Sequence, residues 1–341
     1  MAVVETLSRF GVEKCIDKLL RNPEEGLAQA IDLADRFAGG TGAVQRARVR
    51  RAIEDASDPY YPLLRRILQE VDPRLVRAVV ENLVAGVVIN GRKLQKQSRR
   101  RYGCDIPSVL EIETVPPRGE ADRSRLSSLE LAELIFAGKQ LGIYVYIFSG
   151  GDPLLRRKTL MQLARVHDDC LFLMVTAGSR IDAAFCREVL AAGNVIPVIC
   201  ASAESRSVMQ CLRGHRLFFG VAVLCDGTVT QALNEALLQG AFFCWLTRDL
   251  SVPAAENVQA AVRDFRTSHP LAVVDFPDDA ALVGGCIGWG RYHIAVTAQG
   301  YLRPCPGVPP SEANIRRARL INCLQRLQGE ASACRFDAPD R

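Results

Sequence analysis

The chain has 341 residues, of which 48% are hydrophobic and 24% charged. This composition excludes a disordered protein, and the length suits one large domain or one domain with additions. The formal net charge of +5 permits an acidic ligand but is too small for this length to indicate nucleic-acid binding. No apolar stretch reaches the roughly 20 residues of a membrane-spanning helix, and the first residues lack the apolar region of a secretion signal. We therefore expect a cytoplasmic protein with no membrane or nucleic-acid partner.

Residues 1–103 predict a helical domain. Amphipathic segments of helical period are separated by Asp58-Pro59 and Asp72-Pro73, and each Asp-Pro dipeptide ends one helix and begins the next. A basic run follows at residues 91–101. It indicates either a solvated helix face or linker, or a phosphate-binding patch.

From Val109 the pattern changes to alternating strands and helices, which we assign to a second region, residues 104–270. Six continuous apolar runs predict strands that are buried on both faces. They are residues 109–114, 143–149, 170–176, 195–201, 217–224 and 241–247. Amphipathic helices between them predict a parallel sheet, either open or curled into a partial barrel. The connection after the fourth run is short and polar, so we expect that unit to be eroded.

Residues 271–341 form the third region. A strand at residues 271–276 precedes a Gly-rich turn and a hairpin-like pair at residues 291–305. A short helix is expected at residues 316–327. We assign the three regions as a helical domain, a barrel-like domain and a small C-terminal β-hairpin extension.

The positions of the histidines and cysteines in the sequence do not match a known metal-binding or redox motif. The four histidines are scattered, and we expect structural or surface roles for them. None of the twelve cysteines forms the Cys-x-x-C pair that is typical of zinc and redox sites. Most lie in apolar runs, where a free cysteine packs as a small hydrophobic residue. Cys286 and Cys305 flank the hairpin but need Cys323 and Cys334 to complete four ligands, so we expect no metal.

The strongest local signal is the turn Ser149-Gly150-Gly151-Asp152-Pro153, directly after the second strand. Ligands in such folds lie beyond the carboxyl ends of strands, and two glycines let the backbone approach a ligand closely. Asp152 can accept from a ligand ammonium or cap the next helix. Thr176, Gly178 and Ser179 hold the corresponding position after the third strand. The alternative is a plain joint between strand and helix, in which these residues only turn the chain.

The segment 133–182 resembles the core of radical S-adenosylmethionine (SAM) proteins. Their second strand ends in a Gly-Gly-Glu-Pro motif that contacts the amino group of SAM, and here Asp152 replaces the glutamate. Their third strand ends in Thr-Asn-Gly, which is similar to Thr176-Ala177-Gly178. Residues 284–305 resemble the SPASM or twitch-like C-terminal region, and the likeness extends from roughly residue 20 to residue 315.

The resemblance implies a partial (β/α)6 barrel of the radical SAM type. It also implies SAM as the cofactor, held by residues that follow the second and third strands. These residues are Ser149, Gly150, Gly151, Asp152, Thr176 and Gly178. The catalytic residues are not identified by it.

The loop after the first strand departs from the family. There the family carries a Cys-x3-Cys-x2-Cys triplet that anchors a 4Fe–4S cluster, whereas residues 114–125 contain no cysteine. We therefore expect no iron–sulfur cluster and no deoxyadenosyl radical chemistry. Arg118, Arg123 and Arg125 in this loop could bind the carboxylate of SAM, or they are solvated.

Two functions follow from these patterns. In the first, the protein binds SAM and uses it without radicals, most simply to transfer a methyl group to a small molecule or peptide in a biosynthetic pathway. In the second, it is a non-catalytic pseudoenzyme that serves as a binding or regulatory partner of another pathway enzyme. A third, a cluster enzyme that uses unusual cysteines, is opposed by the lack of three cysteines at suitable spacing.

Overall fold

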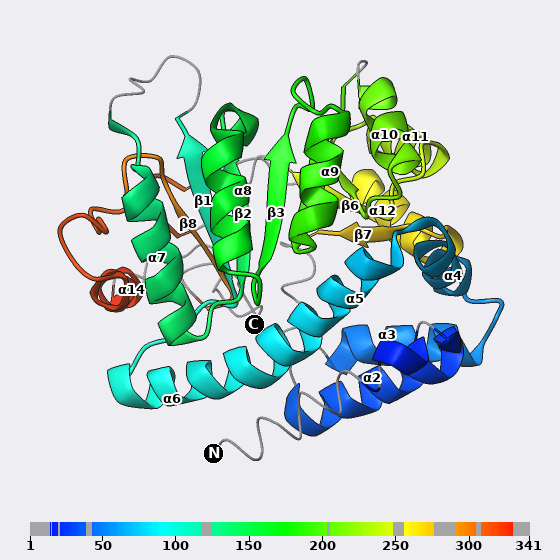
Figure 1. Cartoon of the computed structure of the whole chain (residues 1–341), viewed down its shortest axis with the longest axis horizontal. Helices are drawn as coiled ribbons and strands as arrows, with labels where there is room; N and C mark the ends of the chain where they lie inside the picture. Colours follow the sequence, from blue (N-terminus) through cyan, green and yellow to red (C-terminus); the bar gives the residue numbers. More distant parts are fainter. Residues whose placement is uncertain are drawn as a thin grey trace.

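The centre of the computed structural model is one nine-stranded sheet flanked by helices (Figure 1). The strand order is β7-β6-β5-β4-β3-β2-β1-β8-β9. The structure describes residues 14, 16–19, 21–38, 43–116, 124–202, 205–247, 256–275, 291–304 and 308–329.

The six predicted strands all form, and a seventh extends the parallel sheet. Their apolar runs are long enough for strands and are covered by helices, as expected for parallel sheets. The strands are β1 (Val109–Val115), β2 (Val145–Gly150), β3 (Leu171–Thr176), β4 (Val195–Cys200), β5 (Gly220–Leu224), β6 (Phe243–Thr247) and β7 (Ala272–Val274). Each pairs in parallel with its neighbour in this series.

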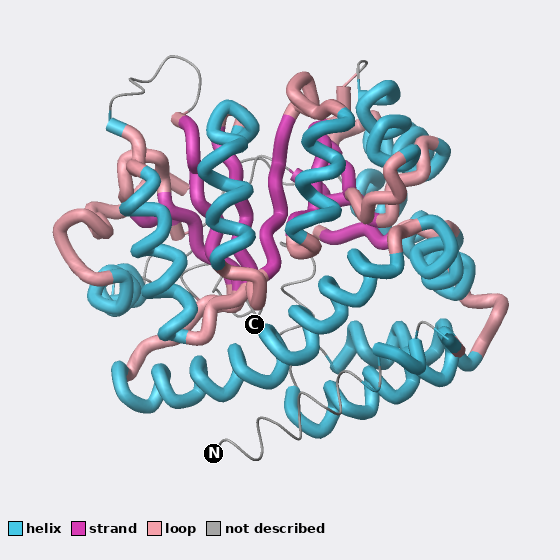
Figure 2. Tube along the Cα trace, in the orientation of Figure 1, coloured by secondary structure: helices cyan, strands magenta, loops and turns pink. Residues whose placement is uncertain are grey.

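A helix follows each of the first six strands, and Figure 2 shows several of them in front of the sheet. They are α7 (Ser128–Leu141), α8 (Arg157–Val166, after the 3-10 turn η3, Pro153–Arg156), α9 (Ala183–Ala192), α10 (Ser205–Gly214), α11 (Val229–Leu238) and α12 (Glu256–Ser268). The expectation of an eroded fourth unit is wrong, because α10 has 10 residues, as do α8 and α9.

The alternation of side chains gives the sheet two different faces. Leu110 and Ile112 of β1 are fully buried in the hydrophobic core. Glu111 and Glu113 alternate with them and therefore lie on the opposite, inner face of the curled sheet.

The helical leader lies at the edge where the strands begin (Figure 1). It comprises α2 (Pro23–Ala38), α3 (Ala43–Glu54), α4 (Tyr60–Glu70), α5 (Pro73–Glu81), the π-helical η1 (Asn82–Gly91) and α6 (Arg92–Tyr102). Asn82 Nδ2 donates to the carbonyls of Asp168 and Cys170, at 2.8 and 3.1 Å, just before β3. These contacts place the leader away from the carboxyl ends of the strands. The basic run at residues 91–101 is helical, as one of its two interpretations predicted.

The predicted C-terminal hairpin forms from β8 (His293–Val296) and β9 (Leu302–Arg303). It is part of the main sheet, because β8 pairs in parallel with β1 from Val109–His293 to Ile112–Val296. The helix α14 (Leu320–Gly329) follows. The division into three domains stays a prediction.

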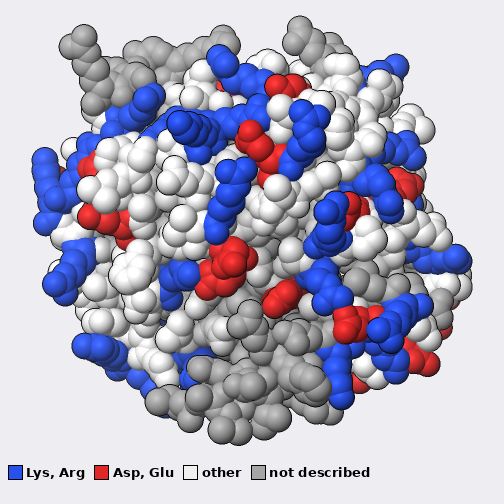
Figure 3. Space-filling view, in the orientation of Figure 1, with Lys and Arg blue, Asp and Glu red and all other residues white. Residues whose placement is uncertain are grey.

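Two features bear on the expected partners. No described helix is both long and apolar enough to cross a membrane. On the face shown in Figure 3, Lys and Arg side chains are spread over several helices, with Asp and Glu among them. This mixed pattern lends no support to a nucleic-acid-binding surface on that face.

Candidate functional site at the carboxyl edge of the sheet

The turn after β2 and the end of β3 are joined by a chain of hydrogen bonds. Thr176 Oγ1 donates to Asp152 Oδ1 at 2.8 Å, and the backbone N–H of Gly178 donates to Thr176 Oγ1 at 3.1 Å. Asp152 Oδ1 also accepts from the Leu154 N–H at 3.1 Å, so it caps η3. The structure thus brings together three of the predicted site residues, and the capping interpretation of Asp152 is confirmed.

The two glycines of the turn pack closely against the end of β1. Gly150 has φ +106°, and a Cβ there would lie 2.1 Å from the carbonyl oxygen of Val115. The Gly151 N–H donates to the same oxygen at 3.0 Å, and a Cβ on Gly151 would lie 2.9 Å from the carbonyl oxygen of Pro116. Glycine is therefore required here by packing within the protein. Both glycines are also exposed at the edge, where a ligand can reach them.

The inner face beside this turn carries a polar cluster in which Ser149 and His293 are buried and Glu111 is half-buried. Ser149 Oγ donates to Glu111 Oε1 at 2.6 Å, and the Nε2 atom of His293 lies 3.1 Å from Glu111 Oε2. The side chains come from β2, β1 and β8, and the parallel pairing of β8 with β1 brings His293 into place. Only 3% of His293 is exposed. The cluster therefore joins an acid, an imidazole and a hydroxyl on one face.

The Glu111 carboxyl favours its ionised form. Burial alone would raise its pKa, but the hydrogen bonds from His293 and Ser149 and the charges of His293 and Arg303 outweigh burial and lower the pKa below its ordinary value. An ionised carboxylate can only accept hydrogen bonds, so the ring of His293 donates to it through Nε2.

A second acid continues the cluster along β1. Glu113 forms an ion pair with Arg303 of β9 and accepts from the Ala298 N–H at 3.4 Å. Thr114 Oγ1 donates to the Ser149 carbonyl at 3.3 Å and ties the ends of β1 and β2 together. Two ionisable pairs, each joining β1 to the C-terminal hairpin, therefore line the inner face.

The sequence interpretation missed these pairs. The available signal was the alternation in "VLEIET", which puts Glu111 and Glu113 on one face of a strand that is otherwise apolar. Buried acids require partners. The partners His293 and Arg303 had no local signal, since their position depends on the pairing of β8 with a distant strand.

Several other residues from the sequence interpretation lie elsewhere. Arg118 and Arg123 fall outside the described residues, as do Cys286, Cys305 and Cys334. Arg125 is half-buried, and its carbonyl accepts from Arg316 Nη2 at 3.0 Å. Cys323 is buried in α14.

No protein-family model and no curated protein matches the chain. Solved structures of SuiB from Streptococcus suis do match. SuiB bound to the precursor peptide SuiA has a TM-score of 0.57 at 11% identity, covering 72% of this chain and 71% of SuiB. SuiB bound to S-adenosylmethionine has a TM-score of 0.56 at 11% identity, covering 71% and 72%.

At this identity the likeness concerns the fold alone. It agrees with the nine-stranded curled sheet and its outer helices. The predicted fold class is confirmed: the chain is a partial α/β barrel of the radical SAM type.

Proposed function

We propose that this protein binds S-adenosylmethionine at the carboxyl edge of β1–β3 and transfers its methyl group, without radicals, to a small molecule or a peptide. The observation that carries the proposal is the position of the ionised Glu111, which joins Ser149 of the predicted SAM turn to His293. The structures of SuiB with S-adenosylmethionine and with a precursor peptide support this choice of cofactor and substrate class.

Methyl transfer fits the groups on this face. The S–CH3 bond of the sulfonium breaks as a bond forms from the methyl carbon to a nitrogen or oxygen of the substrate. The products are the methylated substrate, S-adenosylhomocysteine and the proton of the nucleophile. We assign Glu111, the ionised acid of this face, to accept that proton, and holding the two reactants in line supplies much of the rate.

The charges of the edge also suit the cofactor. SAM carries a sulfonium and an ammonium group. Asp152 Oδ2 lies 3.9 Å from Arg180 Nε, in a loose pair in which only 17% of the Asp152 side chain is exposed. We infer that the ammonium of SAM approaches this carboxylate, where the family places a glutamate.

We include no radical step in the proposal. Reductive cleavage of SAM needs a cluster anchored by three thiolates, and residues 114–125 contain no cysteine. Methyl transfer needs no electron and no cluster.

The proposal is tested by calorimetric titration with SAM and with S-adenosylhomocysteine. We expect micromolar binding of SAM by the wild type and a loss of about tenfold or more in Asp152→Ala, which corresponds to one charge-assisted contact. Asp182→Ala is the matched control, because Asp182 also caps a helix, through the Phe185 N–H. Equal affinity for SAM in the two variants would show that SAM does not bind at this turn.

The pseudoenzyme remains the second candidate, and the structure offers one observation in its favour. The carboxylate of Asp152 already accepts hydrogen bonds from Thr176 and Leu154, and the two glycines pack against the end of β1. Packing and hydrogen bonding within the protein therefore explain these residues without a ligand. Absence of binding to both SAM and S-adenosylhomocysteine would favour this candidate. Crosslinking to enzymes encoded by neighbouring genes would then identify the partner.

A further inference from the structure

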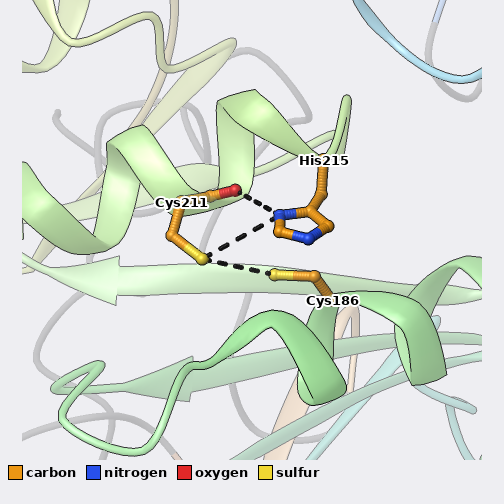
Figure 4. Close-up of side chains that lie close together, drawn as sticks. All are labelled: Cys186, Cys211 and His215. Carbon is orange, nitrogen blue, oxygen red and sulfur yellow. Dashed lines mark hydrogen bonds between the residues drawn. The ribbon is translucent and has the colours of Figure 1, made fainter.

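Two outer helices bring two cysteines and a histidine together, away from the carboxyl edge. Cys186 lies on α9, Cys211 lies on α10, and His215 directly follows α10 (Figure 4). Cys211 and His215 are four residues apart, which is one helical turn, so both face the same way. Among the described residues, this is the one group of at least three Cys, His, Asp or Glu side chains compact enough to share an ion.

The distances suit one small cation. The two sulfurs are 3.9 Å apart, and the Sγ atom of Cys211 is 3.9 Å from Nδ1 of His215. All three ligand atoms lie within 4.8 Å of one another. A tetrahedral Zn²⁺ ion, with bonds of about 2.3 Å to sulfur and about 2.0 Å to nitrogen, requires separations of about 3.5–3.8 Å. The ligand atoms need only small movements to reach these values.

The histidine ring is already oriented by a backbone hydrogen bond. Nδ1 of His215 lies 2.9 Å from the carbonyl oxygen of Cys211, and a carbonyl only accepts, so Nδ1 carries the proton. Nδ1 is also the ring nitrogen that lies 3.9 Å from the Sγ atom of Cys211, so an ion bound there takes the place of this proton. In the metal-free protein the hydrogen bond holds the ring beside the two sulfurs.

The alternative occupants of this group fit less well. In a 4Fe–4S cluster each thiolate binds a different iron, which holds the sulfurs farther apart than two ligands of a single ion. A disulfide between Cys186 and Cys211 requires the sulfurs to close from 3.9 Å to about 2.05 Å and gives no role to His215. Two thiolates and an imidazole are ligands that Zn²⁺ prefers.

We propose that Cys186, Cys211 and His215 bind one Zn²⁺ ion, with the remaining coordination position open to water or to a further ligand. The ion joins α9 to α10 on the outer side of the sheet. The proposal departs from our expectation from the sequence that the chain has no metal site. The signal was the spacing Cys-x3-His on an amphipathic helix, which we did not consider.

The test measures zinc content and does not involve SAM. Protein stripped with a chelator is incubated with zinc, desalted and analysed for metal, and Co²⁺ is used in parallel as a coloured probe of thiolate ligands. We expect about one zinc per chain in the wild type and at least about tenfold weaker binding in Cys211→Ser and His215→Ala. Cys104→Ser and His269→Ala, which lie outside the group, serve as matched controls and should bind like the wild type.

Thermal melts with and without zinc show whether the variants are folded. Zinc should raise the Tm of the wild type and of both controls but not of the two cluster variants. Absence of zinc at micromolar concentration, or equal zinc content in all variants, overturns the proposal. Loss of two thiols as a Cys186–Cys211 disulfide without zinc uptake also overturns it. Because SAM binding is measured separately, either proposal can fail without the other.

Discussion

The carboxylate of Glu111 accepts a hydrogen bond from Nε2 of His293 at 3.1 Å, although 182 residues separate the two in the sequence. The contact exists because β8 returns to the barrel and pairs with β1 in parallel. The C-terminal hairpin is thereby tied to the strand whose following loop has no cysteine. The acid of this contact therefore comes from β1 and the imidazole from β8 of the C-terminal hairpin.

Replacing Glu111 tests this link through stability. Glu111→Gln should lower the free energy of unfolding near neutral pH by about 1–3 kcal/mol, because a neutral amide bonds His293 and Ser149 less strongly. The folded-state pKa of Glu111 is lowered, so its contribution is present above the ordinary value of 4.5 and is lost as pH falls through the folded-state pKa. Urea unfolding at about pH 7, 4 and 3 measures the free energy of unfolding of both proteins. The difference between the wild type and Glu111→Gln should become smaller below about pH 4.5.

Glu312→Gln is the control for this experiment. Glu312 pairs with Arg326 at 2.7 Å, but 86% of its side chain is exposed. An exposed pair of this kind contributes at most about 1 kcal/mol. The loss of unfolding free energy in Glu111→Gln could instead stay constant from neutral to acidic pH. That result would contradict an ionised Glu111 paired with His293.

A second carboxylate reports on how the C-terminal segment docks. Glu130, in the capping box of α7, has its pKa lowered to about 2, first by the hydrogen bond from Arg316 and then by the Ser127 N–H. An NMR titration should place its midpoint near 2 in the wild type. Arg316→Ala should move the midpoint upward, toward the ordinary glutamate value. Arg326→Ala, whose partner is Glu312, should leave it unchanged, and an unmoved midpoint in Arg316→Ala would show that the segment is not docked there.

The sequence predicts the barrel well because its signals are local. The run "VLEIET" predicts β1, and the glycine turn predicts the edge of β2, since strand length and turn chemistry depend on neighbouring residues. The prediction that the fourth unit is eroded is wrong because the many polar residues of α10 outweigh its apolar pattern. Only Met209 and Leu212, which are buried at helical spacing, indicate the helix. His293 could not be assigned, since the pairing of β8 with β1 depends on long-range contacts that leave no local pattern.

The glycine turn provides a test of packing that is independent of any ligand. Gly150→Ala should destabilise the protein by about 1–3 kcal/mol, because its φ of +106° is strained for other residues. A Cβ would also lie 2.1 Å from the Val115 carbonyl oxygen. Gly227→Ala is the control, as no atom lies within 4 Å of a Cβ there. Chemical denaturation of the two variants gives the comparison, and equal stabilities would mean that the turn does not pack on β1.

A buried amide of the leader, that of Asn82, bonds to the barrel and gives the last prediction. Asn82 Nδ2 is shared between the carbonyls of Asp168 and Cys170, and removing it leaves both oxygens without this donor. Asn82→Ala should therefore cost about 1–3 kcal/mol in the free energy of unfolding. Asn234→Ala removes an amide that bonds only to Thr230 within the exposed face of α11, and should change stability by less than about 0.5 kcal/mol. If hydrogen exchange shows the leader opening by itself in Asn82→Ala, while β1 to β3 stay protected, the leader is a separate cooperative unit docked at the start of the strands. Loss of protection throughout would instead make the leader and barrel one unit, and would contradict the division at residue 103.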